Sequence, residues 1–209
     1  MTLYDGNLRR ALDLYGPHRR RWMMFVDGEN LAIRGKEVLA DLLAPGNLYV
    51  PDVFLWRPNG APQIAFPELV NQNDYAPRAI RCHYYTSAKG DEGRLEDLRA
   101  QFRAAGSEPE VFKRRDGKSK GVDIALARDF LGHAYKDNYD SAVLVAGDGD
   151  YVPLVEDVKR LGKTVAIAFF AGPFVNRRLM VEADSFLDLT NHFRSVWAAA
   201  KPKSPSPEV

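Results

Sequence analysis

Runs of apolar residues as long as a β-strand alternate along the chain with segments whose apolar residues recur at helical spacing. The first run, Trp22–Asp27, reads WMMFVD and is apolar up to its last position. An uninterrupted run of this length is typical of a strand that is buried on both faces of a sheet. The apolar residues between Leu31 and Leu42 then fall on one face of a predicted helix, which Pro45-Gly46 ends.

The same alternation continues toward the end of the chain. Four further strands are predicted at residues 79–88, 108–113, 141–148 and 164–170. Helices are predicted near residues 95–105, 122–135, 152–161 and 174–183, followed by a short FLDL segment and a last helix that ends near residue 200. Strands that alternate with helices indicate a mostly parallel sheet packed between helix layers and joined by right-handed crossovers.

This pattern predicts one α/β domain at residues 21–200. Residues 1–20 are charged and amphipathic and are predicted to form an N-terminal helical extension. Residues 201–209 are polar and proline-rich, which is typical of a disordered tail. Residues 52–76 are rich in Pro and Asn and are predicted to be an excursion from the core, whose role stays open.

Charge and cysteine content limit the kinds of partner and site. The 209 residues include 29 Lys and Arg against 28 Asp and Glu, so binding of nucleic acid must rely on local patches. The single cysteine, Cys82, excludes an internal disulfide and a cysteine metal site. No signal peptide is visible, and the apolar stretch after Thr164 is too short to span a bilayer. We therefore expect a cytoplasmic protein without a membrane partner, and homodimer formation stays open.

Three aspartates come at the ends of predicted strands or just after them. Asp27 ends the first strand, Asp148 ends the strand at 141–148, and Asp150 follows in the next turn. The carboxyl ends of parallel strands share one edge of a sheet, where ligands bind in this class of fold. We therefore expect these three side chains to lie on the same side of the domain.

A fourth aspartate, Asp123, stands in the first turn of the predicted helix at 122–135. Positions 126, 127, 130 and 134 on its face are Leu, Ala, Phe and Ala, so the carboxylate is predicted to point toward the sheet. Burying it there without a partner is costly. Carboxylates gathered in a cleft raise one another's pKa, and Mg²⁺ or Mn²⁺ is the counter-charge that prefers such oxygens.

Each aspartate also has a plainer interpretation. Asp150 and Asp123 are placed as helix caps or dipole partners often are, and Asp27 before Gly28 fits an ordinary strand-exit turn. Asn30 is as well placed to cap its helix as to reach the cleft. Four separate coincidences aimed at one edge are the less economical account, so a shared site is the favoured interpretation.

The segments that carry these residues also resemble a known family. VDGEN, KGVDIALARD, VAGDGDYVPLVEDVKRLGKTV and EADSFLDL resemble the NYN domains of the LabA-like group, relatives of the PIN-domain nucleases. The resemblance runs from Trp22 to Leu189 and is weak around residues 52–76. It implies a PIN-like three-layer α/β/α fold with a central, mostly parallel sheet of five or six strands, and an acidic metal site for RNA hydrolysis.

The resemblance also implies roles for single residues. The acids Asp27, Asp123, Asp148 and Asp150 match the family's catalytic, metal-binding positions, with Mg²⁺ or Mn²⁺ as cofactor. Asn30 and Asp184 match polar positions beside them, although Asp184 is equally placed to cap the FLDL connection. Ala146 and Gly147 stand where family members often carry Ser or Thr before the Gly-Asp pair, which removes one polar side chain near the acids.

A basic loop precedes Asp123 and is the candidate contact for RNA, single-stranded or structured. Basic side chains there are placed to bind phosphates on either side of a scissile bond, and a solvated loop is the alternative. Its members are Lys113, Arg114, Arg115, Lys118 and Lys120.

Three functions compete at this point. A metal-dependent endoribonuclease, with metal-activated water as nucleophile, accounts for all four acids. A non-catalytic module that binds RNA or protein is the rival, because the near-zero net charge is unlike many nucleic-acid binders. A phosphatase ranks last, because DGEN lacks the second aspartate expected of an aspartyl-phosphate nucleophile.

Overall fold

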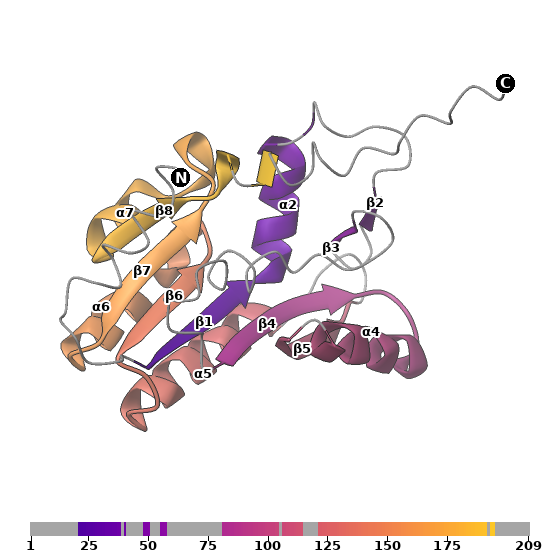
Figure 1. The fold of residues 1–209 in the computed structure, drawn as a ribbon, viewed down its shortest axis with the longest axis horizontal. Helices are drawn as coiled ribbons and strands as arrows, with labels where there is room; N and C mark the ends of the chain where they lie inside the picture. Colours follow the sequence, from indigo (N-terminus) through magenta and orange to yellow (C-terminus); the bar gives the residue numbers. More distant parts are fainter. Residues whose placement is uncertain are drawn as a thin grey trace, which may run out of the picture.

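A six-stranded sheet runs through the centre of the domain in the computed structural model (Figure 1). The structure describes residues 21–38, 40, 48–50, 55–57, 81–104, 106–114, 121–191 and 193–194. The strand order is β5-β4-β1-β6-β7-β8, and every neighbouring pair is parallel. The strands are β1 (Trp22–Asp27), β4 (Arg81–Ala88), β5 (Glu108–Lys113), β6 (Ser141–Val145), β7 (Thr164–Phe169) and β8 (Ser185–Asp188).

Helices follow most of these strands and return the chain to the sheet, as parallel pairing requires. The α-helices are α2 (Gly28–Val38), α4 (Glu92–Ala104), α5 (Val122–Tyr135), α6 (Val152–Arg160) and α7 (Arg177–Glu182). Two 3₁₀ turns, η3 (Gly149–Tyr151) and η4 (Gly172–Phe174), precede α6 and α7. A separate antiparallel pair is formed by β2 (Leu48–Val50) and β3 (Leu55–Arg57).

The central strands explain the uninterrupted apolar runs of the sequence. Every residue of β1 and of β6 is buried, because each strand is flanked by other strands and covered by helices on both faces. Phe25 lies at the centre of this core, with its ring against Phe130 of α5 at 4.9 Å and against Tyr139 at 5.8 Å. Burial on both faces therefore selects apolar residues at consecutive positions.

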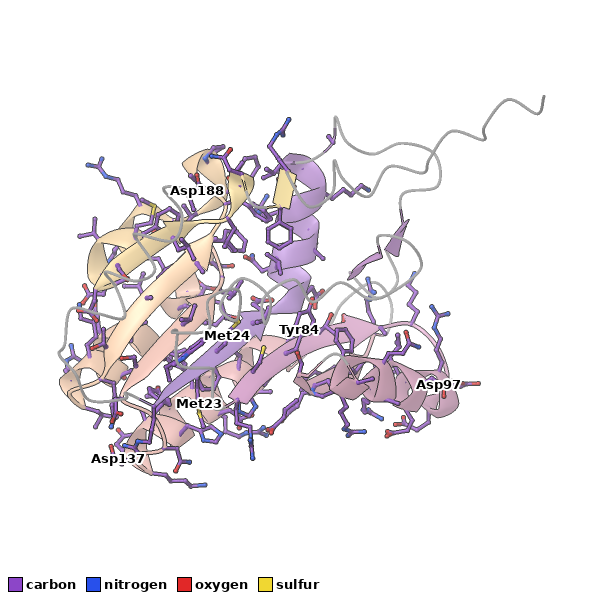
Figure 2. The ribbon with its side chains drawn as sticks, viewed as in Figure 1. Met23, Met24, Tyr84, Asp97, Asp137 and Asp188 are labelled. Carbon is purple, nitrogen blue, oxygen red and sulfur yellow. The ribbon has the colours of Figure 1, made fainter. Side chains whose placement is uncertain are left out.

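Two neighbouring tyrosines show that helices cover both faces of the sheet. Successive residues of a strand point to opposite faces. Tyr84 stacks on Phe102 of α4 at 4.7 Å, whereas the hydroxyl of Tyr85 donates to Asp129 of α5 at 2.9 Å. Figure 2 shows Tyr84 on β4 within this packing. The three-layer α/β/α architecture that the sequence indicated is confirmed.

Several predicted boundaries differ from the observed ones. The helix α7 begins at Arg177 rather than near residue 174, because the side chain of Asn176 caps its first turn. The structure describes α2 as far as Val38, and the predicted stop at Pro45-Gly46 lies outside the described residues. The first three residues of the FLDL segment belong to β8, which pairs with β7 as an edge strand of the sheet. Residues 1–20 and 201–209, and most of the last predicted helix, lie outside the described residues.

The excursion at residues 52–76 includes β3, which pairs with β2 just before it. The rest of that segment lies outside the described residues. Among the helices of the described ranges, none has the length and apolar character needed to cross a membrane.

Candidate active site

Asp27 is the buried centre of the candidate site. It is the last residue of β1, and the strand alternation that turns Phe25 toward α5 turns Asp27 the same way. Only 3% of its surface is exposed. Its Oδ1 accepts a hydrogen bond from the backbone N–H of Asn30 at 2.9 Å, and its Oδ2 accepts one from the hydroxyl of Tyr151 at 2.9 Å.

Asp123 reaches the same hydroxyl from a different element. Its Oδ1 lies 3.1 Å from the hydroxyl of Tyr151, so one tyrosine contacts the carboxylates of both Asp27 and Asp123. The apolar stripe below it is buried as predicted, with Leu126 and Phe130 fully enclosed. Asp123 itself is exposed, however, although it lies in the first turn of α5 beside the buried Val122. The carboxylate therefore borders the site and faces solvent.

Asp148 and Asp150 lie in the turn that follows β6. Asp148 is the N-cap of η3, and its Oδ1 accepts a hydrogen bond from the backbone N–H of Asp150 at 3.1 Å. Both residues are exposed. The capping role considered for Asp150 is thus carried by Asp148, and the turn sets Tyr151 in place directly after the two acids.

Asn30 connects the ends of two central strands. Its Oδ1 accepts from the backbone N–H of Gly147 at 3.0 Å, and its own N–H donates to Asp27. The chain around Gly149 is held from the other side, where an added Cβ would lie 2.5 Å from the Nδ2 of Asn176. Asn30 therefore lies beside the acids as predicted, and its side chain braces the turn.

The charge at this edge is only partly compensated. Burial, with a smaller contribution from the charges of Asp123 and Glu29, raises the pKa of Asp27 to about 7, against the hydrogen bonds from Asn30 and Tyr151, which lower it. Burial also raises the pKa of Tyr151 well above its ordinary range, so its hydroxyl remains a donor. A carboxylate pair of this kind favours either a proton or a cation.

Two of the four acids are placed to share a divalent metal ion. Within the described ranges, no three His, Cys, Asp or Glu side chains are grouped closely enough to hold an ion, so the expected four-carboxylate cluster is not formed. The reason is local: Asp148 is engaged in capping η3, and only Asp27 and Asp123 share a contact. Mg²⁺ is commonly held by one or two carboxylates together with waters and substrate phosphates, and the Asp27–Asp123 pair fits that mode.

A known domain family matches most of the chain. The sequence model of the NYN domain family matches residues 21–190. The chain belongs to the NYN domain family. A solved structure of a protein of unknown function from Vibrio parahaemolyticus RIMD 2210633 is similar to this NYN domain, with 21% identity and a TM-score of 0.58. The match covers 83% of this chain and 95% of that one, and at this identity it shows the fold alone. No curated protein matches the chain.

Asp184 is not brought to the acids of this NYN domain. Its Oδ2 accepts from the backbone N–H of Val165 at 2.8 Å, at the start of β7, and its Oδ1 lies 3.4 Å from the Nζ of Lys159. The starts of parallel strands lie at the edge of the sheet opposite to their ends, where Asp27 is found. Asp184 therefore joins β8 to β7, in line with the capping alternative.

The basic loop is described only in part. Lys113 ends β5 and is exposed. Arg114 is buried, with 9% of its surface exposed, and its backbone N–H donates to Ala88 at 2.8 Å, so it does not present the open side chain expected of a phosphate ligand. The other three basic residues, Arg115, Lys118 and Lys120, lie outside the described residues.

Two polar side chains at this edge of the NYN domain were missed from the sequence. Tyr151 is not among the residues that the sequence singled out, although it directly follows GDGD. Glu29 is not among them either; it is partly buried, and its Oε2 accepts from the hydroxyl of Ser87 near the end of β4 at 3.2 Å. Both contacts join residues far apart in sequence, which a local pattern cannot reveal.

Proposed function

We propose that this NYN domain protein is a ribonuclease of the LabA-like group that hydrolyses RNA phosphodiester bonds internally with the help of Mg²⁺ or Mn²⁺. The observation that carries the proposal is the convergence of Asp27 and Asp123 on one hydroxyl at the carboxyl edge of the sheet. Membership of a family related to the PIN-like nucleases supports the same activity.

The acids have different parts in this proposal. Asp27 and Asp123 hold the divalent ion, and Asp148 and Asp150, exposed in the adjoining turn, are proposed to supply further oxygen ligands to it when the substrate is bound. A bound ion supplies a nucleophilic water near neutral pH and positive charge beside the phosphodiester. Asn30 connects the Asp27 carboxylate to the turn at Gly147 through its two hydrogen bonds.

Substrate binding is proposed to come from local basic residues, because the chain as a whole carries a net charge of only +1. Lys113 is exposed at the end of β5, the same edge as the acids, since β5 is parallel to β4 and β4 to β1. Together with Arg115, Lys118 and Lys120, it is proposed to contact the RNA backbone. Such contacts set the orientation of the strand and carry little sequence information.

The test is RNA cleavage by the purified full chain. Single-stranded and structured RNA are incubated with protein and Mg²⁺ or Mn²⁺, with and without EDTA. Asp27→Asn and Asp148→Asn are expected to lower the rate by more than about 100-fold, and Asn at 148 retains the cap of η3. Asp97→Asn is the matched control, because Asp97 projects from α4 away from the sheet (Figure 2).

Two results would count against the nuclease. Cleavage that persists in EDTA and in both site variants would trace to a contaminant or to another site. Tight RNA binding without cleavage, unchanged in Asp148→Asn, would instead support the non-catalytic binding module.

A further inference from the structure

We propose that Tyr151 is a positioning residue whose hydroxyl holds the carboxylates of Asp27 and Asp123 in the arrangement that receives a divalent cation. The proposal rests on the proposed function, because it concerns the same acidic pair. It adds a residue that touches neither the RNA nor the ion and that acts through the two ligands.

The first support is the contact itself. The hydroxyl oxygen of Tyr151 lies 2.9 Å from Oδ2 of Asp27 and 3.1 Å from Oδ1 of Asp123. These residues come from η3, from the end of β1 and from the first turn of α5, and they are separated by 124 and 28 positions from the tyrosine. Among the hydrogen bonds of the described residues, no other joins these two carboxylates.

The second support is that the tyrosine is itself held firmly. Only 4% of its surface is exposed, and its backbone N–H donates to the carbonyl of Asp148 at 3.4 Å. The turn before it is closed by the Asp148 cap and tied to α2 by the bond from Gly147 to Asn30. A hydroxyl fixed in this way sets the positions of its partners more than it follows them.

The third support is chemical. A hydroxyl carries one proton, so at any moment it donates to one carboxylate and only borders the other. Asp27 has a second donor, the N–H of Asn30, whereas Asp123 is exposed and receives no other hydrogen bond among the described contacts. Without the hydroxyl, repulsion between the two charges would move the Asp123 carboxylate away from Asp27, and binding of an ion would have to bring the two carboxylates back together.

Outer partners of metal ligands of this kind commonly change metal affinity by about 10-fold to 100-fold when they are removed. We therefore expect Tyr151→Phe to weaken Mn²⁺ binding to the metal-free full chain, without RNA, by about 10-fold. Phenylalanine fills the same space, so the fold is retained. The measurement is a calorimetric titration with Mn²⁺, checked by thermal unfolding of each variant.

Tyr139→Phe is the matched control. Tyr139 is fully buried, and its hydroxyl donates to the carbonyl of Phe130 at 2.9 Å. The residue lies just before β6 begins, so its backbone is at the edge of the sheet opposite to the acids. Both variants lose one buried hydroxyl, so general loosening of the core would weaken Mn²⁺ binding in both. Weakening confined to Tyr151→Phe supports the positioning role.

The outcomes separate the two proposals. If the wild type binds Mn²⁺ and Tyr151→Phe binds it equally well, the positioning role is wrong and the metal-dependent nuclease stands. If the two tyrosine variants lose affinity alike, the positioning role is also wrong. If the wild type itself binds no Mn²⁺ in the absence of RNA, the positioning role is wrong, and the RNA cleavage assay with EDTA decides the nuclease separately, because substrate phosphates complete the ion site in that proposal.

Discussion

Replacing Asp27 by asparagine is expected to stabilise the folded protein at high pH while it abolishes the proposed activity. Asp27 is almost fully buried, and its pKa is raised from 3.8 to about 7. At 1.36 kcal/mol for each pKa unit, keeping this carboxylate ionised costs the folded state about 4 kcal/mol. Asparagine removes that charge, while its amide oxygen still accepts from Asn30 and its amide N–H₂ faces the hydroxyl of Tyr151.

The sign of the effect depends on pH. Above pH 7 the carboxylate is ionised in the folded and the unfolded chain, so the full cost is present. As the pH falls from 7 toward 3.8, the folded protein takes up a proton before the unfolded chain does, and stability rises. Between pH 8.5 and pH 5, the advantage of Asp27→Asn over the wild type should therefore shrink by about 3 kcal/mol.

Urea unfolding at these two pH values measures the difference directly. Subtracting the wild type from the variant at each pH removes the titration of all other groups. Asp97→Asn, an exposed change on α4 (Figure 2), is expected to shift stability by less than about 0.5 kcal/mol at either pH. Equal differences for Asp27→Asn at pH 8.5 and pH 5 would refute the burial argument, and so would a variant less stable than the wild type at pH 8.5.

Two further substitutions and one labelling experiment test other parts of the structure. Gly28→Ala should destabilise the fold by about 2 kcal/mol in urea unfolding, because an added Cβ would lie 2.2 Å from the ring of Tyr84; an unchanged midpoint would contradict this. Asn30→Ala should cost about 1–2 kcal/mol and lower cleavage, since the N–H of Gly147 loses its acceptor, and full activity would argue against the brace. Cys82 should resist a thiol reagent at pH 8 until the protein is unfolded, because it is buried and its pKa is raised to about 11; rapid labelling of the native protein would oppose this.

A control is available for the glycine change. Gly132 lies within α5, and nothing stands within 4 Å of a Cβ added there. Gly132→Ala is therefore expected to be neutral or to stabilise the protein by up to about 1 kcal/mol, since alanine favours the helix. A similar loss in both variants would show that substitution of any helical glycine is harmful here.

Much of the fold was predictable from the pattern of apolar residues. The strand at Glu108–Lys113 and the helix at Val122–Tyr135 were predicted with their observed bounds, because the run length and the helical spacing record burial directly. The start of α7 was misplaced near residue 174, since the helix begins at Arg177, after the cap that the side chain of Asn176 forms. Helix ends depend on caps and on tertiary contacts, which apolar spacing does not encode.

The candidate site was also predictable only in part. The predicted strand ends and the sheet-edge rule placed Asp27 and Asp148 at one edge, and the apolar stripe below Asp123 predicted that α5 packs beside them. The exposure of Asp123 and the burial of Arg114 were not predictable, because each depends on how far a loop or helix end extends past its neighbours. Residue type alone says nothing about that distance.

Alternation of apolar runs and helical stripes was thus enough to specify a parallel α/β domain and the edge at which its acids gather. Folding in three dimensions decided which of those acids meet. Asp27 and Asp123 are joined through Tyr151, whereas Asp184 is carried to the start of β7 and Asp148 is engaged in its own turn. The physical reason is that strand and helix patterns report burial along one element, while hydrogen bonds between side chains depend on the packing of several.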